Sequence, residues 1–268
     1  MYKSAKQSSM EKHILKLLSG KALEAAQLLF ADPELQAMQE YANIVSIKRL
    51  GFNDHGPVHM RKATLNAIKM FNLLHAAGIQ MNLEKEEAGT AEDSLIGVLF
   101  ASLLHDLGMS IARDSHELIS IQLASPFIDK ILDAIYPADA YMNKTAIRSI
   151  AIEGIFGHMA NRRIHSLEAG LVLIGDGSDM EMGRARIPQM LSNEPRVGDI
   201  HRTSAGSIQH VIIEKGKEKP ISITVEMSAS VGFFQVEEVF FPKINISPVK
   251  PYIELYAGVT DREMLRYL

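Results

Sequence analysis

The 268-residue sequence predicts a mainly α-helical protein with a small α+β module at its C-terminal end. Two observations predict this fold class. Through most of the chain, apolar residues recur three and four positions apart, as they do on one face of a helix. After residue 200, apolar residues instead alternate with polar ones in segments rich in β-branched side chains. We therefore expect a helical domain over residues 1–195 and the module over residues 196–268.

The N-terminal part shows three helical segments in order. An amphipathic segment over residues 10–30 is the first. A second helix begins at Asp32-Pro33, where Asp can cap the helix and Pro can occupy its first position, and extends to Leu50. The turn-forming residues 51–57 then open a third helix that ends near Gly78.

The middle of the chain is expected to contain the centre of the core. Residues 79–91 are polar and predict a loop. The following helix, Glu92–Leu107, is apolar on nearly every side, which is typical of a helix buried in a core. Further helices, separated by prolines or polar residues, are expected over residues 113–124, 126–136, 143–159 and 166–181.

The C-terminal module shows strand patterns. Ser207–Glu214 and Ile221–Met227 alternate in polarity and are joined by a short polar connection that contains Gly and Pro, which predicts an antiparallel hairpin. A short helix is expected over Val231–Val239 and another strand over Tyr252–Val259. The module is therefore expected to contain an antiparallel sheet.

Composition limits the chemistry that is open to the chain. It has no Cys and ten His, so a metal would be held by His, Asp and Glu, and a disulfide framework or a thiol nucleophile is excluded. A net charge of -4 is not typical of a general nucleic-acid-binding protein. The longest strongly apolar stretch, Leu95–Leu104, is about half of the roughly 20 residues that a membrane span needs. The N-terminus is polar and lacks a secretory signal, so we expect a cytoplasmic protein without a membrane partner.

His105 and Asp106 lie next to each other at the end of the apolar helix. Burying an imidazole and a carboxylate costs several kcal/mol unless both find partners. A divalent cation would satisfy both groups at once. Taken alone, however, the dipeptide fits a hydrogen-bonded pair at a helix end even better.

Two further His can reach the same region. His59 lies in the helix that Pro57 begins. His55, one turn earlier, can converge with it on one metal if the helix begins that early. Since Pro57 fits best in the first turn, we prefer His59 as the ligand and expect His55 at the mouth of the site. His116 begins a helix further along the chain.

The late part of the helical region supplies His158 and Asp176, and both continue the apolar stripe of their helix. A hydrogen-bonded core histidine explains His158 equally well. The helix of Asp176 also carries Gly170, Gly175 and Gly177, each of which weakens a helix by about 1 kcal/mol relative to Ala. Such glycines are expected where another helix or a ligand approaches closely.

The order of these residues resembles the motif of the HD superfamily of metal-dependent phosphohydrolases. That motif has an early His, an adjacent His-Asp and a late Asp, which His59, His105-Asp106 and Asp176 match over about residues 50–185. The resemblance implies an HD-type helical bundle, in an uncharacterised subgroup with a C-terminal module. It also implies that these four residues hold a divalent cation, with His105 and Asp106 at the catalytic centre.

HD proteins with two metals add two more His, which His116 and His158 match best, with Asp106 as the bridge between the ions. His165 is a weaker competitor for the second site. We expect two metals rather than one, because an inward His158 and a His116 at a helix start would otherwise be coincidences. Ligation by N and O alone does not distinguish Mn, Fe, Mg, Zn, Co and Ni.

The implied activity is hydrolysis of a phosphoester in a nucleotide or small phosphorylated metabolite by a metal-activated water. A di-iron oxygenase on the HD fold and a non-catalytic nucleotide-binding regulatory protein are the alternatives, and a homodimer is expected. Asp179 can orient a ligand imidazole or cap a turn. Candidates for contact with the substrate, each equally explained as a surface or structural charge, are His55, Arg61, Lys62, Arg163, Arg184 and Arg186, of which Arg184 is preferred.

Overall fold

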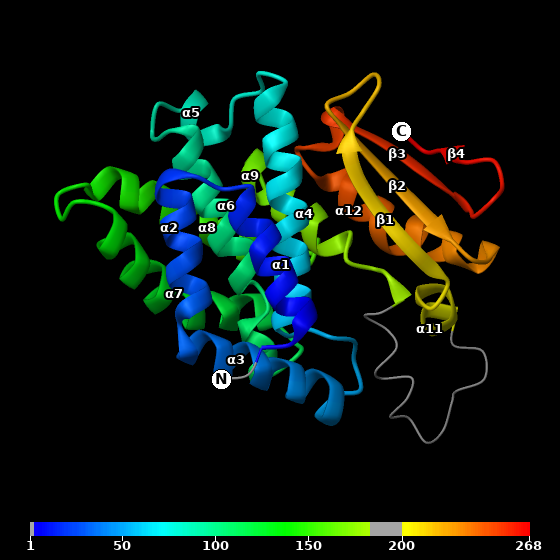
Figure 1. The fold of residues 1–268 in the computed structure, drawn as a ribbon, viewed down its shortest axis with the longest axis horizontal. Helices are drawn as coiled ribbons and strands as arrows, with labels where there is room; N and C mark the ends of the chain where they lie inside the picture. Colours follow the sequence, from blue (N-terminus) through cyan, green and yellow to red (C-terminus); the bar gives the residue numbers. More distant parts are fainter. Residues whose placement is uncertain (1–2, 183–199) are drawn as a thin grey trace.

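The structure is a computed structural model that describes residues 3–182 and 200–268. A bundle of helices forms most of it, and a four-stranded sheet with short helices packs beside the bundle (Figure 1). The prediction of a mainly helical protein with a small C-terminal α+β module is therefore confirmed. The bundle helices are α1 (Ala5–Lys16), α2 (Gly20–Ala31), α3 (Pro33–Ile44), α4 (Pro57–Ala76), α5 (Asn82–Lys85), α6 (Ala91–Leu104), α7 (His116–Ile135), α8 (Tyr141–Gly157) and α9 (Leu167–Gly177).

Local sequence signals set many of the helix ends. The Asp32 side chain accepts hydrogen bonds from two backbone N–H groups of α3, and Pro33 occupies the first position of that helix. Thr90 and Asp93 form a reciprocal capping box at the start of α6. After α3 the chain continues as a π-helical turn, η1 (Val45–Arg49), so the predicted second helix extends almost to Leu50.

Three boundaries differ from the prediction. Residues 10–30 are split into α1, which ends at Lys16, and α2, which begins at Gly20, where a φ of 54° changes the direction of the chain. The predicted break at Pro126 is wrong, because α7 continues through it as one helix. An interior proline costs about 3 kcal/mol, and in α7 the buried side chains on both sides of Pro126 offset this cost. The predicted loop over residues 79–91 contains the single-turn helix α5.

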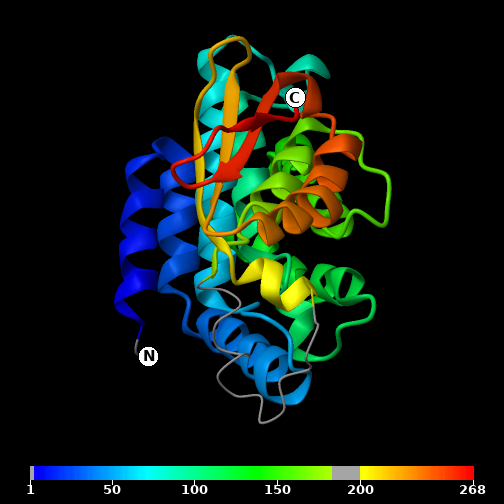
Figure 2. The ribbon, with the colours of Figure 1, turned by 90° about the vertical axis from the view of Figure 1, so that its right-hand side faces the viewer.

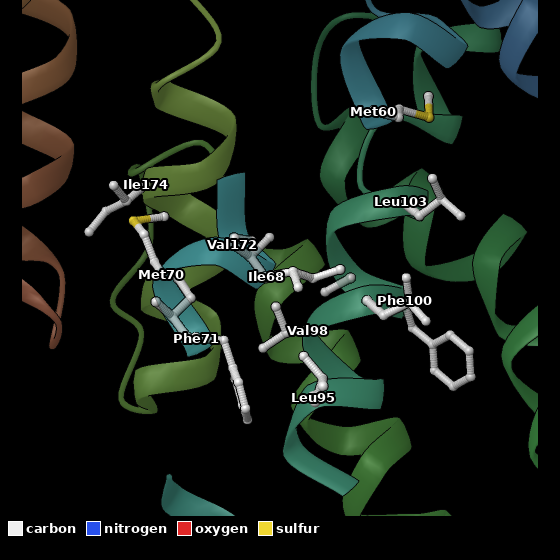
Figure 3. Close-up of a cluster of buried hydrophobic side chains, with 14 of the residues drawn as sticks. Met60, Ile68, Met70, Phe71, Leu95, Val98, Phe100, Leu103, Val172 and Ile174 are labelled. Carbon is white, nitrogen blue, oxygen red and sulfur yellow. The ribbon is translucent and has the colours of Figure 1, made fainter. Parts of the chain in front are cut away.

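The core lies between α4, α6 and α9, and α6 is buried on almost every side, as its composition predicts. Figure 3 shows buried hydrophobic side chains that these three helices contribute to the core. The labelled side chains are Met60, Ile68, Met70 and Phe71 of α4, Leu95, Val98, Phe100 and Leu103 of α6, and Val172 and Ile174 of α9. Gly175 allows α9 to approach α4, because a Cβ there would lie 2.8 Å from the carbonyl oxygen of Ala63. This is the close approach expected from the glycines of this helix.

The C-terminal sheet has the order β1 (Ile208–Lys215), β2 (Ile221–Met227), β3 (Ile253–Val259), β4 (Leu265–Arg266). β1 and β2 form the predicted antiparallel hairpin, but β2 and β3 are parallel, so the sheet is mixed rather than antiparallel. A parallel pair needs a crossover connection, which is supplied here by the helical residues between Met227 and Ile253. These residues include η4 (Gln235–Phe240) and α12 (Phe241–Ile246) where one short helix was expected.

The sheet and the bundle share one hydrophobic cluster, which includes residues of both. β1 lies along α4, and the sheet faces the viewer in Figure 2. The boundary predicted at residues 195 and 196 falls outside the described residues, so the division into two domains stays a prediction. Among the helices of residues 3–182 and 200–268, none has the length and apolar character that crossing a membrane requires.

Glu254 of β3 organises the β1–β2 connection. Its carboxylate accepts hydrogen bonds from the backbone N–H groups of Lys217, Glu218 and Lys219, and the residue is buried. Burial would raise the pKa of Glu254, but these donors lower it below the usual value. Ionised Glu254 therefore stabilises the folded protein at pH values above the usual glutamate pKa. This stabilisation is lost as the pH falls through the lowered pKa of Glu254 in the folded protein.

We expect the substitution Glu254→Gln to lower the free energy of unfolding by about 1–2 kcal/mol, because a neutral amide accepts these hydrogen bonds more weakly than a carboxylate. Urea unfolding at neutral pH measures the change. Glu263→Gln is the matched control, because Glu263 is exposed in the same module. Equal midpoints for the two variants would contradict this role of Glu254.

Candidate metal centre

The ends of five helices bring the candidate ligands together. His59 lies in the first turn of α4, and Asp176 lies near the end of α9. His105 caps the C-terminus of α6, His158 caps that of α8, and His116 begins α7. All of these side chains and that of Asp106 are buried, although they are separated by as many as 117 positions in the chain. The apolar faces of the helices therefore converge on a polar cluster.

One half of the cluster surrounds Asp106 Oδ2. This oxygen lies 3.3 Å from His59 Nε2 and 3.2 Å from His105 Nε2. Asp176 Oδ1 approaches the same two nitrogens, at 3.2 Å from His59 and 3.7 Å from His105. The two Nε2 atoms are themselves 3.2 Å apart. Four side chains thus direct one ligand atom each towards a common point.

The other half surrounds Asp106 Oδ1. His116 Nε2 lies 3.2 Å from this oxygen and His158 Nε2 lies 3.6 Å from it, while the two nitrogens are 3.0 Å apart. Both groups, His59–His105–Asp106 and Asp106–His116–His158, have ligand atoms close enough to hold a metal ion. Asp106 belongs to both, with one oxygen in each.

Hydrogen bonds fix the orientation of the four imidazoles. In three of them Nδ1 lies 2.7–2.9 Å from the carbonyl oxygen three residues earlier, which is that of Ser102 for His105, Arg113 for His116 and Ile155 for His158. A carbonyl oxygen only accepts, so Nδ1 carries the proton and Nε2 of the neutral ring carries a lone pair. The fourth ring, His59, has its Nδ1 2.7 Å from Asp179 Oδ2. All four lone pairs therefore point into the cluster.

Facing lone pairs repel unless a cation or a proton lies between them. Asp106 Oδ2 is buried and has no hydrogen-bond donor among the described residues, although two ring nitrogens lie near it. A buried acceptor without a partner is costly. Ligand imidazoles that donate their other N–H to a carbonyl or a carboxylate are the usual arrangement around a protein-bound metal. The residues present thus fit a divalent cation.

The charges inside the cluster are strongly coupled. Burial opposes ionisation of Asp106, but the nearby His105 holds the pKa of this carboxyl well below its usual value. Burial would lower the pKa of His105, but Asp106 outweighs it and raises this pKa to about 9. Burial lowers the pKa of His158 to about 4. These shifts show that the buried charges interact strongly, and a metal that binds here must replace any proton on its ligand atoms.

Asp179 and His55 lie beside the cluster. Asp179 is positioned to orient His59 through Nδ1, which is the arrangement proposed from its spacing to Asp176. His55 lies in the segment before α4, where Pro57 places it, and its ring centroid is 5.8 Å from that of His59. Its Nδ1 lies 2.7 Å from the carbonyl oxygen of Asn53. His55 is thus a neighbour of the metal cluster and is not one of its two ligand groups.

The side chain of Arg61 faces away from the metal cluster. Its guanidinium is buried, pairs with Glu11 at 2.7 Å, and donates to Gln39 and to the carbonyl oxygen of Pro57. It lies two positions after His59, which on a helix places it about 200° around the axis, on the side of α1. Contact between Arg61 and a substrate phosphate therefore has no support in this geometry and stays a prediction.

The other positively charged residues predicted to contact the substrate lie in different parts of the structure or outside the described residues. Lys62 Nζ is 3.4 Å from Glu181 Oε1, and Arg163 is exposed in the segment between α8 and α9. Arg184 and Arg186 lie outside the described residues. His165, the weaker candidate for the second metal, is exposed, and His116 and His158 form the second group instead.

Sequence reasoning missed Lys243. Its Nζ lies 2.5 Å from Asp176 Oδ2, from a position 67 residues further along the chain. Burial would raise the pKa of Asp176, but this ammonium group holds it well below the usual value. The contact depends on how the C-terminal module packs, so no local pattern indicates it.

The sequence of the chain is similar to that of an archaeal protein. A protein of Methanocaldococcus jannaschii that carries the name "Uncharacterized protein MJ1020" is 38% identical to it over 232 residues, which is 86% of each chain. No family model matches the chain, and no solved structure matches it. The name of the relative assigns no activity, so a function has to be inferred from the geometry of the cluster.

Proposed function

The chain belongs to the same family as the archaeal protein MJ1020, and we propose that its buried cluster is the active site of an HD-type metal-dependent phosphohydrolase. The helical bundle and the buried His and Asp groups are compatible with an HD domain. The observation that carries the proposal is the position of Asp106, whose two oxygens face separate groups of imidazole nitrogens. A carboxylate in this position could serve as a ligand to each of two adjacent divalent cations.

The proposed ligands divide into two sets. His59, His105, Asp106 and Asp176 would hold one ion, and Asp106 would share the second with His116 and His158. Imidazoles and carboxylates suit Mn, Fe, Co, Ni and Zn, and the number of imidazoles makes a site for Mg alone a poor match. Divalent cations, when bound, lower the pKa of water and polarise a phosphoryl oxygen.

The residues of the chain would orient the metal ligands and supply the charges around the cations. Carbonyl oxygens at the helix ends hold three imidazole rings in place, and Asp179 holds that of His59. Because the cluster is buried, its electrostatic interactions are weakly screened. Contacts between the substrate and Lys62, Arg184 or Arg186 stay predictions. The proposed substrate is a nucleotide or another small phosphorylated metabolite.

Release of phosphate tests the proposal. Purified protein supplied with Mn2+ is incubated without oxygen with phosphomonoesters, phosphodiesters and nucleotides. We expect at least one class to be hydrolysed, and we expect Asp106→Asn to reduce its turnover to background, because the amide cannot bridge two cations as a carboxylate does. Asp139→Asn is the matched control, since Asp139 is exposed and lies outside both metal groups.

Two results would overturn the proposal. Turnover that requires both iron and oxygen would indicate the oxygenase chemistry found on related helical folds. Nucleotide binding that is unchanged in Asp106→Asn, together with no turnover of any substrate in the native protein, would indicate a regulatory binding protein.

A further inference from the structure

Lys243 connects the C-terminal module to the metal cluster. It lies on α12, and its Nζ contacts Asp176 Oδ2 at 2.5 Å and donates to the carbonyl oxygen of His158 at 3.0 Å. These partners are on α9 and at the end of α8. One side chain of the module therefore reaches two of the helices that supply candidate ligands.

Two glycines on one side of α9 allow the C-terminal module to pack closely against this helix. Gly170 and Gly177 are seven residues apart, so they lie on the same side of the helix. A Cβ on Gly170 would lie 2.7 Å from Ser247 Oγ, and one on Gly177 would lie 2.9 Å from Lys243 Cδ. α12 lies against α9, as Figure 2 shows for the orange helix beside the green ones. The two glycines thus make room for the segment that carries Lys243.

The two oxygens of Asp176 have different surroundings. Oδ1 faces His59 Nε2 at 3.2 Å, inside the cluster, whereas Oδ2 is bound by Lys243. The side chains of Lys243 and Asp176 are only 13% and 8% exposed, so water screens this pair weakly. The lysine therefore holds the carboxylate plane in an orientation in which one oxygen faces the cluster and the other faces the module.

We infer that Lys243 is a positioning residue of the metal centre, and that the C-terminal module is a working part of this centre. By holding Oδ2 of Asp176, it keeps Oδ1 directed into the cluster, where a cation would bind. Groups that orient a metal ligand in this way typically contribute about 10–100-fold to metal affinity. The inference requires metal binding but not phosphoester hydrolysis, so it goes beyond the proposed function.

Metal binding and docking of the C-terminal module on the bundle should be thermodynamically coupled. If the docked lysine raises the affinity for the metal by some factor, the bound metal favours the docked module by the same factor. Amide hydrogen exchange in α12 is therefore expected to slow when metal is added to the native protein.

Binding of Co2+ to three variants tests the inference. Lys243→Met keeps the length of the apolar stem and removes the charge, and we expect it to weaken Co2+ binding by about tenfold or more and to change the visible absorption of the bound ion. Lys243→Arg should restore part of the affinity. Lys250→Met is the matched control, because Lys250 belongs to the same module and has no described contact with the cluster. Circular dichroism checks that each variant is folded.

Unchanged or tighter Co2+ binding in Lys243→Met would overturn the inference, because it would mean that the ammonium group only neutralises Asp176 or competes with the metal. If this variant does not fold, amide exchange of the native protein decides the question. Exchange in α12 that is the same with and without Co2+ would also overturn the inference. Neither readout depends on phosphate release, so a failure here is distinct from a failure of the proposed hydrolase activity.

Discussion

Replacing both His105 and Asp106 by alanine is expected to remove the bound metal from the purified protein. The double variant deletes the one carboxylate that faces both groups of imidazoles, together with an imidazole of the first group. His59, His116, His158 and Asp176 remain, but each group then has only two of its proposed ligands. Elemental analysis by plasma mass spectrometry, after dialysis against metal-free buffer, measures the change in ions per chain.

Two comparisons sharpen this result. His13→Ala combined with Asp139→Ala removes the same residue types from exposed positions and should leave the metal content unchanged. His116→Ala alone should lower the content without abolishing it, because this residue belongs to the second group only. Full retention of metal in the His105 and Asp106 double variant would refute the assignment of the site.

The substitution Arg61→Met is expected to lower the free energy of unfolding by about 3 kcal/mol, because it removes the buried counter-ion of Glu11 and leaves this carboxylate only the more exposed Lys3. It also removes the donors that Gln39 and Gln36 accept from, in the layer where α1 and α3 meet α4. Urea unfolding measures the loss. The metal content of the folded variant should equal that of the native protein, since Arg61 faces away from the cluster.

The control for this prediction is Arg148→Met. Arg148 pairs with Asp129 at 2.5 Å, but both side chains are more than a third exposed, so its removal should cost less than about 1 kcal/mol. The role assigned to Arg61 would be contradicted if both variants were destabilised equally.

The sequence predicted the parts of the site that depend on local periodicity. His158 and Asp176 continue apolar stripes, and His105 ends an apolar helix, so burial of all three follows from the 3.6-residue period. Their convergence on one cluster follows because a single core collects the apolar faces of all the helices. The order of the motif then indicated which of these buried polar residues meet.

Other features depend on packing between distant segments. Arg61 lies two positions after His59 on the same helix. Neighbouring helix positions face different directions, so closeness in sequence did not place its guanidinium near the cluster. The contact of Lys243 with Asp176 depends on where the C-terminal module docks, and the parallel pairing of β2 with β3 depends on how the chain between these strands crosses the sheet. Hydrophobic periodicity carries no information about either, which is why the sequence did not predict these two features.

The bonds from His105, His116 and His158 to carbonyl oxygens three residues earlier have a consequence for how an ion would be captured. The rings are held by main-chain atoms at helix ends, so their directions are set when the bundle folds. An ion would meet imidazole rings that are already held in one orientation. Its binding would therefore cost little conformational entropy of the side chains. The favourable entropy of binding should then come mainly from the water that the ion releases.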